Sequence, residues 1–153
     1  MSKLDERLAE LGLTIPAVAK PVAAYVPAVI TGNLVYTSGQ IPFVDGVLQA
    51  TGKVGAEIDP DAAKALAATC VLNGLAAAHS VIGSLDRITR VVKVVGFVSS
   101  DPSFTGQAGV INGASELLGQ IFGDAGAHAR SAVGVAVLPL DAPVEVELVL
   151  AFA

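Results

Sequence analysis

Apolar residues recur at helical spacing in three stretches of the chain. In residues 2–11, three leucines share one stripe, Ser2 can cap the start and Gly12 follows the end. Residues 59–83 open on an Asp-Pro pair at the N-cap and first helical positions and end on a glycine. Their stripe is made largely of small side chains, which lets a helix approach a sheet closely. The third predicted helix covers residues 107–122.

The other apolar runs have the pattern of β-strands. Two short strands are expected at residues 28–30 and 34–37, on either side of a Thr-Gly-Asn turn, and a third near 47–49. Residues 88–99 are almost continuously apolar and β-branched, which predicts a strand covered on both faces. Residues 15–27 carry three prolines and little periodicity, so we expect an extended arm there.

The last two apolar runs, residues 128–139 and 144–147, flank a turn near Asp141 and predict an antiparallel hairpin. On one face of the first run, Arg130 stands at the end of a row of very small side chains, namely Ala132, Gly134 and Ala136. This row leaves a shallow recess beside a guanidinium, a shape suited to a planar anion. From these residues alone, an ordinary strand that opens with a solvated arginine is the commoner arrangement.

The order of these elements predicts an α+β fold. Two longer helices are expected to pack on one face of a mainly antiparallel sheet. The other face also carries valine and leucine, so something else must bury it. No linker, repeat or low-complexity segment interrupts residues 1–153, which predicts a single domain preceded by the short helix at residues 1–12.

Composition adds an expectation about assembly. The chain is 53% hydrophobic and 15% charged, whereas roughly 25% charged residues are typical of soluble domains. A soluble protein so poor in charge must cover apolar surface, and oligomerisation is the simplest way. Every run of about 18 residues has a polar interruption, and the N-terminus lacks a signal-peptide apolar core. We therefore expect no membrane span and no secretory leader.

Charge and cysteine content disfavour two classes of function. The formal net charge is −5, and the nine lysines and arginines are scattered. Nucleic-acid binding needs concentrated basic residues, so we expect no nucleic-acid partner. Cys70 is the single cysteine, which excludes an intrachain disulfide and fits a cytoplasmic location. One cysteine and two histidines are too few and too separated for a zinc pattern.

Three segments together carry a family resemblance. They read Gly32-Asn-Leu-Val-Tyr-Thr-Ser-Gly-Gln-Ile-Pro42, Ala129-Arg-Ser-Ala-Val-Gly-Val-Ala-Val-Leu-Pro139 and Val144-Glu-Val-Glu147. In this order and at these spacings the chain resembles the Rid family, also called YjgF, whose members have been described as endoribonuclease L-PSP or translation inhibitors. The resemblance implies a chorismate-mutase-like fold and a homotrimer. Its three sheets would face a central barrel and bury the second apolar face, with active sites between subunits.

The resemblance also implies a chemistry. Rid proteins hydrolyse reactive enamines and imines, such as 2-aminoacrylate, to 2-keto acids and ammonia without a metal or an organic cofactor. Carried over to this chain, Arg130 would bind the substrate carboxylate and Glu145 would position the attacking water. The other positions that would contact the substrate or line its pocket are Tyr25, Ser38, Gly39, Asn112 and Ala132.

The chain departs from the best-known deaminases of that family near Arg130. Ala132 replaces a frequent cysteine, and Gly126-Ala-His-Ala129 replaces a Phe-Pro-Ala approach. The spacing from Asn112 to Arg130 is longer by one residue, and the N-terminal helix is extra. These differences indicate a divergent branch. They make His128 a candidate for an additional acid or base, with a structural role as the alternative.

Strand arithmetic adds a constraint on the site. In the expected hairpin, Glu145 would pair near Val137, about 23 Å from Arg130 at roughly 3.3 Å per residue. The two side chains could not then serve one small substrate within one subunit. Either the site is shared between subunits or Glu145 is not catalytic.

Three functions follow as hypotheses. The first is a Rid-type deaminase acting on small carboxylate substrates. The second is a trimeric binding protein for small carboxylates that does not catalyse turnover. The third is a ribonuclease or translation inhibitor, which the acidic charge disfavours.

Overall fold

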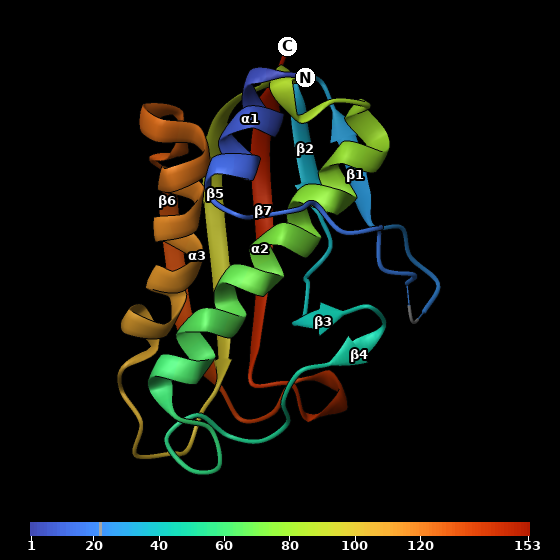
Figure 1. Ribbon diagram of the computed structural model, residues 1–153. Helices are drawn as coiled ribbons and strands as arrows, with labels where there is room; N and C mark the ends of the chain where they lie inside the picture. Colours follow the sequence, from blue (N-terminus) through green and yellow to red (C-terminus); the bar gives the residue numbers. More distant parts are fainter. Residues whose placement is uncertain (22) are drawn as a thin grey trace.

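Figure 1 shows the computed structural model, which describes residues 1–21 and 23–153, as a layer of helices over one face of a twisted sheet. Val22, in the predicted arm, lies outside the described residues. The helices are α1 (Lys3–Glu10), α2 (Pro60–Ile82) and α3 (Gln107–Phe122), with short 3₁₀ turns η1 (Leu85–Arg87), η2 (Gly123–Gly126) and η3 (Pro139–Asp141). The strands are β1 (Ala28–Thr31), β2 (Leu34–Thr37), β3 (Phe43–Val44), β4 (Val47–Leu48), β5 (Ile88–Ser99), β6 (Ala129–Val135) and β7 (Val144–Phe152).

The helix ends follow the capping signals in the sequence. Ser2 caps α1 through a full capping box with Asp5. Asp59 occupies the N-cap position of α2 in extended geometry, although its side chain makes no capping hydrogen bond, and Pro60 follows at the first turn. Gly83 ends α2 at φ 82°, a left-handed conformation that glycine adopts without strain. All three predicted helices are confirmed.

The five-stranded sheet has the order β1-β2-β7-β5-β6, and β3 and β4 form a separate small ribbon. The predicted hairpin between the last two strands is wrong. β7 pairs antiparallel with both β2 and β5, whereas β6 pairs parallel with the far side of β5. Parallel neighbouring strands need a long crossover connection, and α3 supplies it between β5 and β6. The sheet is therefore mixed, with a single parallel pair at one edge.

Small residues bring the layers into close contact. A Cβ atom on Gly74 of α2 would lie 2.9 Å from Leu148 of β7. A Cβ on Gly113 of α3 would overlap the backbone carbonyl of Lys64 in α2. Both glycines are therefore needed for the observed spacing of the helices and the sheet. Cys70 lies in the same core, as a buried small residue.

The length and composition of α2 would also suit a membrane span, but its packing accounts for its apolar character. Of its most apolar window, 56% is buried inside the domain. The buried side includes Ala63, Ala67, Val71 and Leu75, which belong to the core cluster. This is the pattern of a central core helix.

The opposite face of the sheet carries apolar side chains that no described residue covers. Strand pairing places Val29, Tyr36 and Val133 on the same face as Glu145. These three apolar residues are 52%, 45% and 44% exposed. The single chain thus leaves this apolar face uncovered, and its cover from outside the chain stays a prediction.

Candidate functional site

Arg130 lies on β6, the edge strand of the sheet that pairs with β5 (Figure 1), and its side chain reaches α3. Its Nη1 donates to Asn112 Oδ1 at 2.8 Å and to Ser115 Oγ at 3.2 Å. Its Nη2 donates to the carbonyl of Ala108 at 3.4 Å. Three positions of α3 thus hold one guanidinium. The structure brings Asn112 to Arg130 despite the longer spacing, and whether Asn112 lines a substrate pocket stays a prediction.

Consecutive hydrogen bonds link His128, Ser115 and Arg130 and hold the guanidinium in place. The Gly126 carbonyl can only accept, so Nδ1 of His128 donates to it at 2.6 Å. In neutral His128, Nε2 is then the acceptor for the hydroxyl of Ser115, at 2.8 Å. The lone pairs of Ser115 Oγ remain free to accept from Arg130. His128 therefore orients Ser115, and Ser115 orients the guanidinium.

The protein leaves one edge of the Arg130 guanidinium free. Asn112 and Ser115 use both protons of Nη1. Among the described residues, Nε meets no acceptor, and Nη2 has one proton beyond its long bond to Ala108. Nε–H and the Nη2–H beside it are two parallel donors on one side of the planar group, and both stay free when Ala108 accepts the other Nη2–H. This is the geometry that binds a carboxylate with two hydrogen bonds.

Ala132 and Ser38 make contacts inside the single chain. Ala132 follows Arg130 on the same face of β6 and packs against the core. The Ser38 hydroxyl donates to the carbonyl of Val26 at 2.6 Å, which fastens the N-terminal arm to the end of β2. Its role in the described chain is therefore to hold the arm.

Glu145 belongs to a second group of candidate residues. It lies in a small pocket of about 90 Å³ whose lining includes Tyr25, Gly39 and Pro139. A Cβ atom on Gly39 would overlap the Glu145 carboxylate, so glycine is required to let the backbone approach it. Burial raises the pKa of the Glu145 carboxyl, and the nearby charge of Glu147 raises it further. Such a group can take up and release a proton closer to neutral pH than an ordinary glutamate.

The two groups lie on opposite faces of the sheet. Arg130 pairs with Val94 and Glu145 pairs with Phe97, both on β5. They are thus three residues apart along the strands and two strand spacings apart across them, which gives about 14 Å between Cα atoms. The predicted separation of about 23 Å between Arg130 and Glu145 was wrong, because β5 lies between their strands and no hairpin forms. The two side chains still cannot contact one small substrate within one chain, because they point to opposite faces of the sheet.

Ser115 is the residue of this site that the sequence interpretation missed. It follows Asn112 by three positions on α3, and residues at that spacing lie on one face of a helix. That spacing was the signal that could have identified it. Among residues 1–21 and 23–153, no group of three or more His, Cys, Asp or Glu side chains is arranged to hold a metal ion.

Comparison with known proteins identifies the family. A family model described as "YjgF/chorismate mutase-like, putative endoribonuclease" matches residues 5–153. The chain belongs to the YjgF family. The fold inferred from its motifs is therefore confirmed, as an α+β chorismate-mutase-like fold.

Relatives of known structure or sequence cover nearly the whole chain. Protein TCP17 of Trypanosoma cruzi is 44% identical over 146 residues, 95% of this chain and 91% of its own. The crystal structure of a protein of unknown function from Agrobacterium tumefaciens is also 44% identical and has a TM-score of 0.90, covering 98% of this chain and 92% of that one. The Escherichia coli protein TdcF, solved with bound serine, is 25% identical with a TM-score of 0.63, covering 92% of this chain and 96% of that one.

Proposed function

We propose that this YjgF-family protein hydrolyses small enamines and imines that carry a carboxylate, and that a neighbouring copy of the chain completes each site. The observation that carries the proposal is the free edge of the Arg130 guanidinium. Three α3 residues hold the rest of that group while Nε–H and one Nη2–H stay available. A planar carboxylate is the ligand that fits two parallel donors.

Glu145 supplies the acid–base group for the reaction. Its carboxylate accepts a proton from a water molecule while the water oxygen bonds to the imine carbon and the imine nitrogen takes up a proton from solvent. The protonated Glu145 then returns its proton to the nitrogen as the C–N bond breaks, and the hydroxyl formed from water gives its proton to solvent, which releases ammonia and leaves a keto acid. An enamine is first protonated on its β-carbon and enters as the imine. The raised pKa of Glu145 suits both directions of proton transfer.

The opposite orientation of the two groups supports a site between subunits. Arg130 and Glu145 cannot reach one small substrate within a single chain, because the sheet lies between them. The uncovered face that carries Val29, Tyr36 and Val133 offers an apolar surface for assembly. We propose a homotrimer whose three sheets close a central barrel, so that Arg130 of one copy meets Glu145 and Gly39 of the next.

The relatives are consistent with a small carboxylate ligand. TdcF of Escherichia coli was solved with bound serine, which is a small amino acid with a carboxylate. By analogy, the free edge of Arg130 would receive that group in this chain. Only water and the side chains of this protein take part in the proposed steps.

A coupled assay tests the proposal. A pyridoxal-phosphate enzyme generates 2-aminoacrylate in situ, and release of the keto acid is followed with wild-type protein, with Arg130→Ala and with Lys3→Ala. Lys3 is an exposed cation on α1 and serves as the matched control. We expect acceleration by wild type and by Lys3→Ala, and none by Arg130→Ala. Equal acceleration by Arg130→Ala, or no acceleration by assembled wild-type protein, contradicts the proposal.

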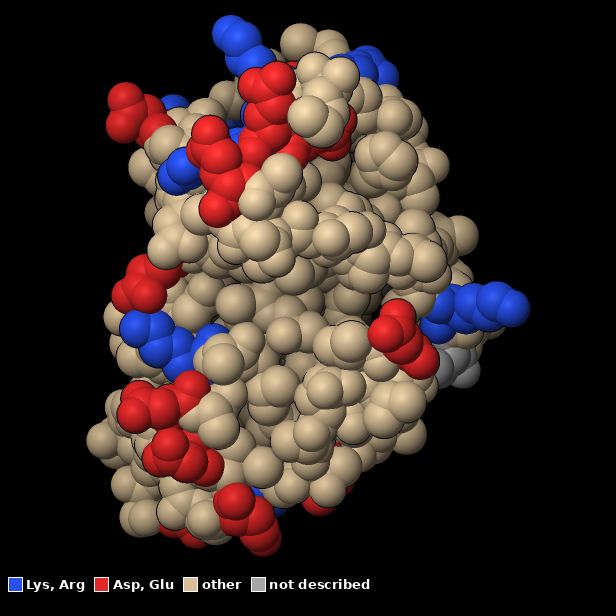
Figure 2. Space-filling view, in the orientation of Figure 1, with Lys and Arg blue, Asp and Glu red and all other residues tan. Residues whose placement is uncertain are grey.

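A carboxylate-binding protein without turnover is the second candidate, because the Arg130 clamp is complete without Glu145. Binding of serine in calorimetry, lost in Arg130→Ala, together with no keto-acid release would establish it. Ribonuclease activity has less support. On the face shown in Figure 2, lysine and arginine side chains are interspersed with aspartate and glutamate, and the formal net charge is −5.

A further inference from the structure

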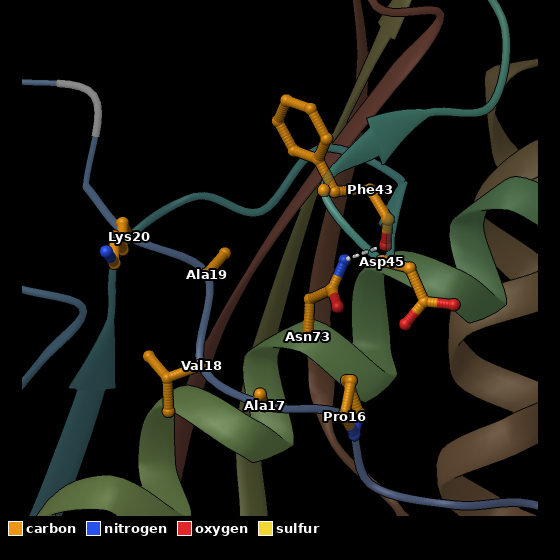
Figure 3. Close-up of a pocket in the computed structure, with 9 residues that line it drawn as sticks. Pro16, Ala17, Val18, Ala19, Lys20, Phe43, Asp45 and Asn73 are labelled. Atoms are coloured by element: carbon orange, nitrogen blue, oxygen red, sulfur yellow. Dashed lines mark hydrogen bonds between the residues drawn. The ribbon is translucent and has the colours of Figure 1, made fainter.

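A second pocket lies between the N-terminal arm, the β3–β4 ribbon and α2 (Figure 3). Its volume is about 430 Å³, within the usual range for small-molecule sites. The residues that line it are Pro16, Ala17, Val18, Ala19, Lys20, Phe43, Asp45, Gly46 and Asn73. The walls are mostly apolar. Neither Arg130 nor Glu145 lines it, although it adjoins the pocket of Glu145 and shares Ala19, Lys20 and Phe43 with it.

Asn73 is the buried polar group of this pocket. The residue is 5% exposed and lies in the middle of α2. Its Nδ2 donates to the carbonyls of Ile41 at 3.2 Å and Phe43 at 3.0 Å. These two carbonyl partners fix which end of the amide is nitrogen. In Figure 3 the nitrogen faces the β3–β4 ribbon, and the amide oxygen is turned away from that bond.

The amide oxygen of Asn73 has no donor within the described part of the chain. All the hydrogen bonds of its side chain are made by Nδ2. The oxygen is not sealed in the core either, because none of the described buried side-chain atoms lacks a partner. It therefore faces the pocket as an open acceptor. Water satisfies such an accessible acceptor, and so does a ligand that brings a donor and displaces the water.

Asp45 gives the pocket a second acceptor and a negative charge. Its carboxylate lies beside Asn73 in Figure 3, with the arm residues on the other side of the space. Lys20 also lines the pocket; it is exposed, as Asp45 is, and among the described residues no ion pair joins the two. An amide oxygen and a carboxylate together recognise N–H donors with a positive charge.

We propose that this pocket binds a small primary ammonium compound with an apolar body. The ammonium group donates to Asn73 Oδ1 and lies near the charge of Asp45. The apolar body fills the space lined by Pro16, Val18 and Phe43. The proposal does not rest on the deaminase activity, because it uses none of the residues assigned to that reaction.

Binding of phenethylammonium, followed by ¹H–¹⁵N NMR, tests this inference. Two analogues of similar size serve as ligand controls: 2-phenylethanol is neutral and phenylacetate is an anion. We expect saturable shifts of the Gly46 amide and the Asn73 side-chain amide with phenethylammonium, and binding at least about fivefold weaker for both analogues. Equal binding of either analogue, or shifts confined to residues outside the pocket, overturns the proposal.

Variants locate the site. Asp45→Asn removes the charge at the same size, and asparagine tolerates the φ of 50° found there, so the variant keeps the turn. We expect it to weaken phenethylammonium binding about fivefold, whereas Asp124→Asn, on the distant η2 turn, leaves binding unchanged. Val18→Trp fills the pocket from the arm and is expected to abolish saturable shifts. Unchanged affinity in Asp45→Asn or in Val18→Trp contradicts the assignment.

Discussion

Arg130 and Glu145 lie on opposite faces of one sheet, with strand β5 between the strands that carry them. Each has what its proposed role requires. Arg130 has a guanidinium held on one side and free on the other, and Glu145 has a carboxyl whose pKa is raised by burial and by Glu147. Within the single chain, however, the two side chains do not come together. The proposed function therefore depends on assembly as much as on these two residues.

The charge of Glu147 is expected to raise the pH below which activity falls, because it raises the pKa of Glu145. Turnover needs ionised Glu145, so the rate should fall as the pH falls through the raised pKa of that group. Glu147→Gln removes the like charge and lowers the pKa of Glu145, although the larger effect of burial remains. We expect the acid limb of the kcat/KM profile to move to lower pH. Glu6→Gln on α1 is the control, and a shift to higher pH would contradict the assignment.

His128 is expected to act as a positioning residue through Ser115. His128→Ala leaves the Ser115 hydroxyl without its acceptor and loosens one of the two bonds at Nη1 of Arg130. Loss of one such bond costs about 0.5–1.5 kcal/mol, so KM should rise roughly two- to tenfold while kcat stays nearly unchanged. Steady-state kinetics measures the two constants. A loss of about two orders of magnitude in the turnover rate, as for an essential acid or base, would contradict the positioning role.

Ser115→Ala tests the same hydrogen-bond chain as His128→Ala, and His79→Ala is the control. Ser115→Ala removes the middle of the hydrogen-bond chain and should give a similar rise in KM, which the double variant with His128→Ala should not greatly exceed. His79 is exposed on α2, so its replacement should leave both constants unchanged. Fully additive effects of the two site variants would show that the two residues act independently.

Two glycines of α3 test the packing of the helix layer. Gly113→Ala places a methyl group against the carbonyl of Lys64 and should lower the free energy of unfolding by about 1–3 kcal/mol. Gly109→Ala meets no atom within 4 Å and should raise it by roughly 0.5–1 kcal/mol, since alanine favours the helix. Urea unfolding of both variants measures the difference. Equal stability of the two variants would contradict the close contact between α2 and α3.

The sequence predicted the helices and most strands because their signals are local. The capping residue Ser2, the Asp59-Pro60 pair and Gly83 mark boundaries by their own backbone chemistry. Pairing between strands is not local, and adjacency in the chain suggested a hairpin that does not form. The sequence did contain a counter-signal. Residues 88–99 are apolar on both faces, as a central strand is, and a full helix separates them from β6, as a parallel crossover requires.

The candidate site was predictable to a similar extent. The small residues that follow Arg130 on its face of β6 predicted a recess beside the guanidinium. In the structure Ala132 packs against the core, Gly134 lies against Gln107, and α3 holds the guanidinium. The contribution of Ser115 depends on which face of α3 meets β6, and the motif of a single strand cannot give that. The contact between Gly39 and Glu145 likewise joins residues more than a hundred positions apart.

Mixed assemblies test the central claim most directly. Arg130→Ala and Glu145→Gln are each expected to be inactive in the 2-aminoacrylate assay. If each site takes Arg130 from one copy and Glu145 from the next, equimolar co-refolding should restore about a quarter of the wild-type sites. No recovery in mixtures shown by mass spectrometry to contain hybrid assemblies would contradict a site shared between subunits.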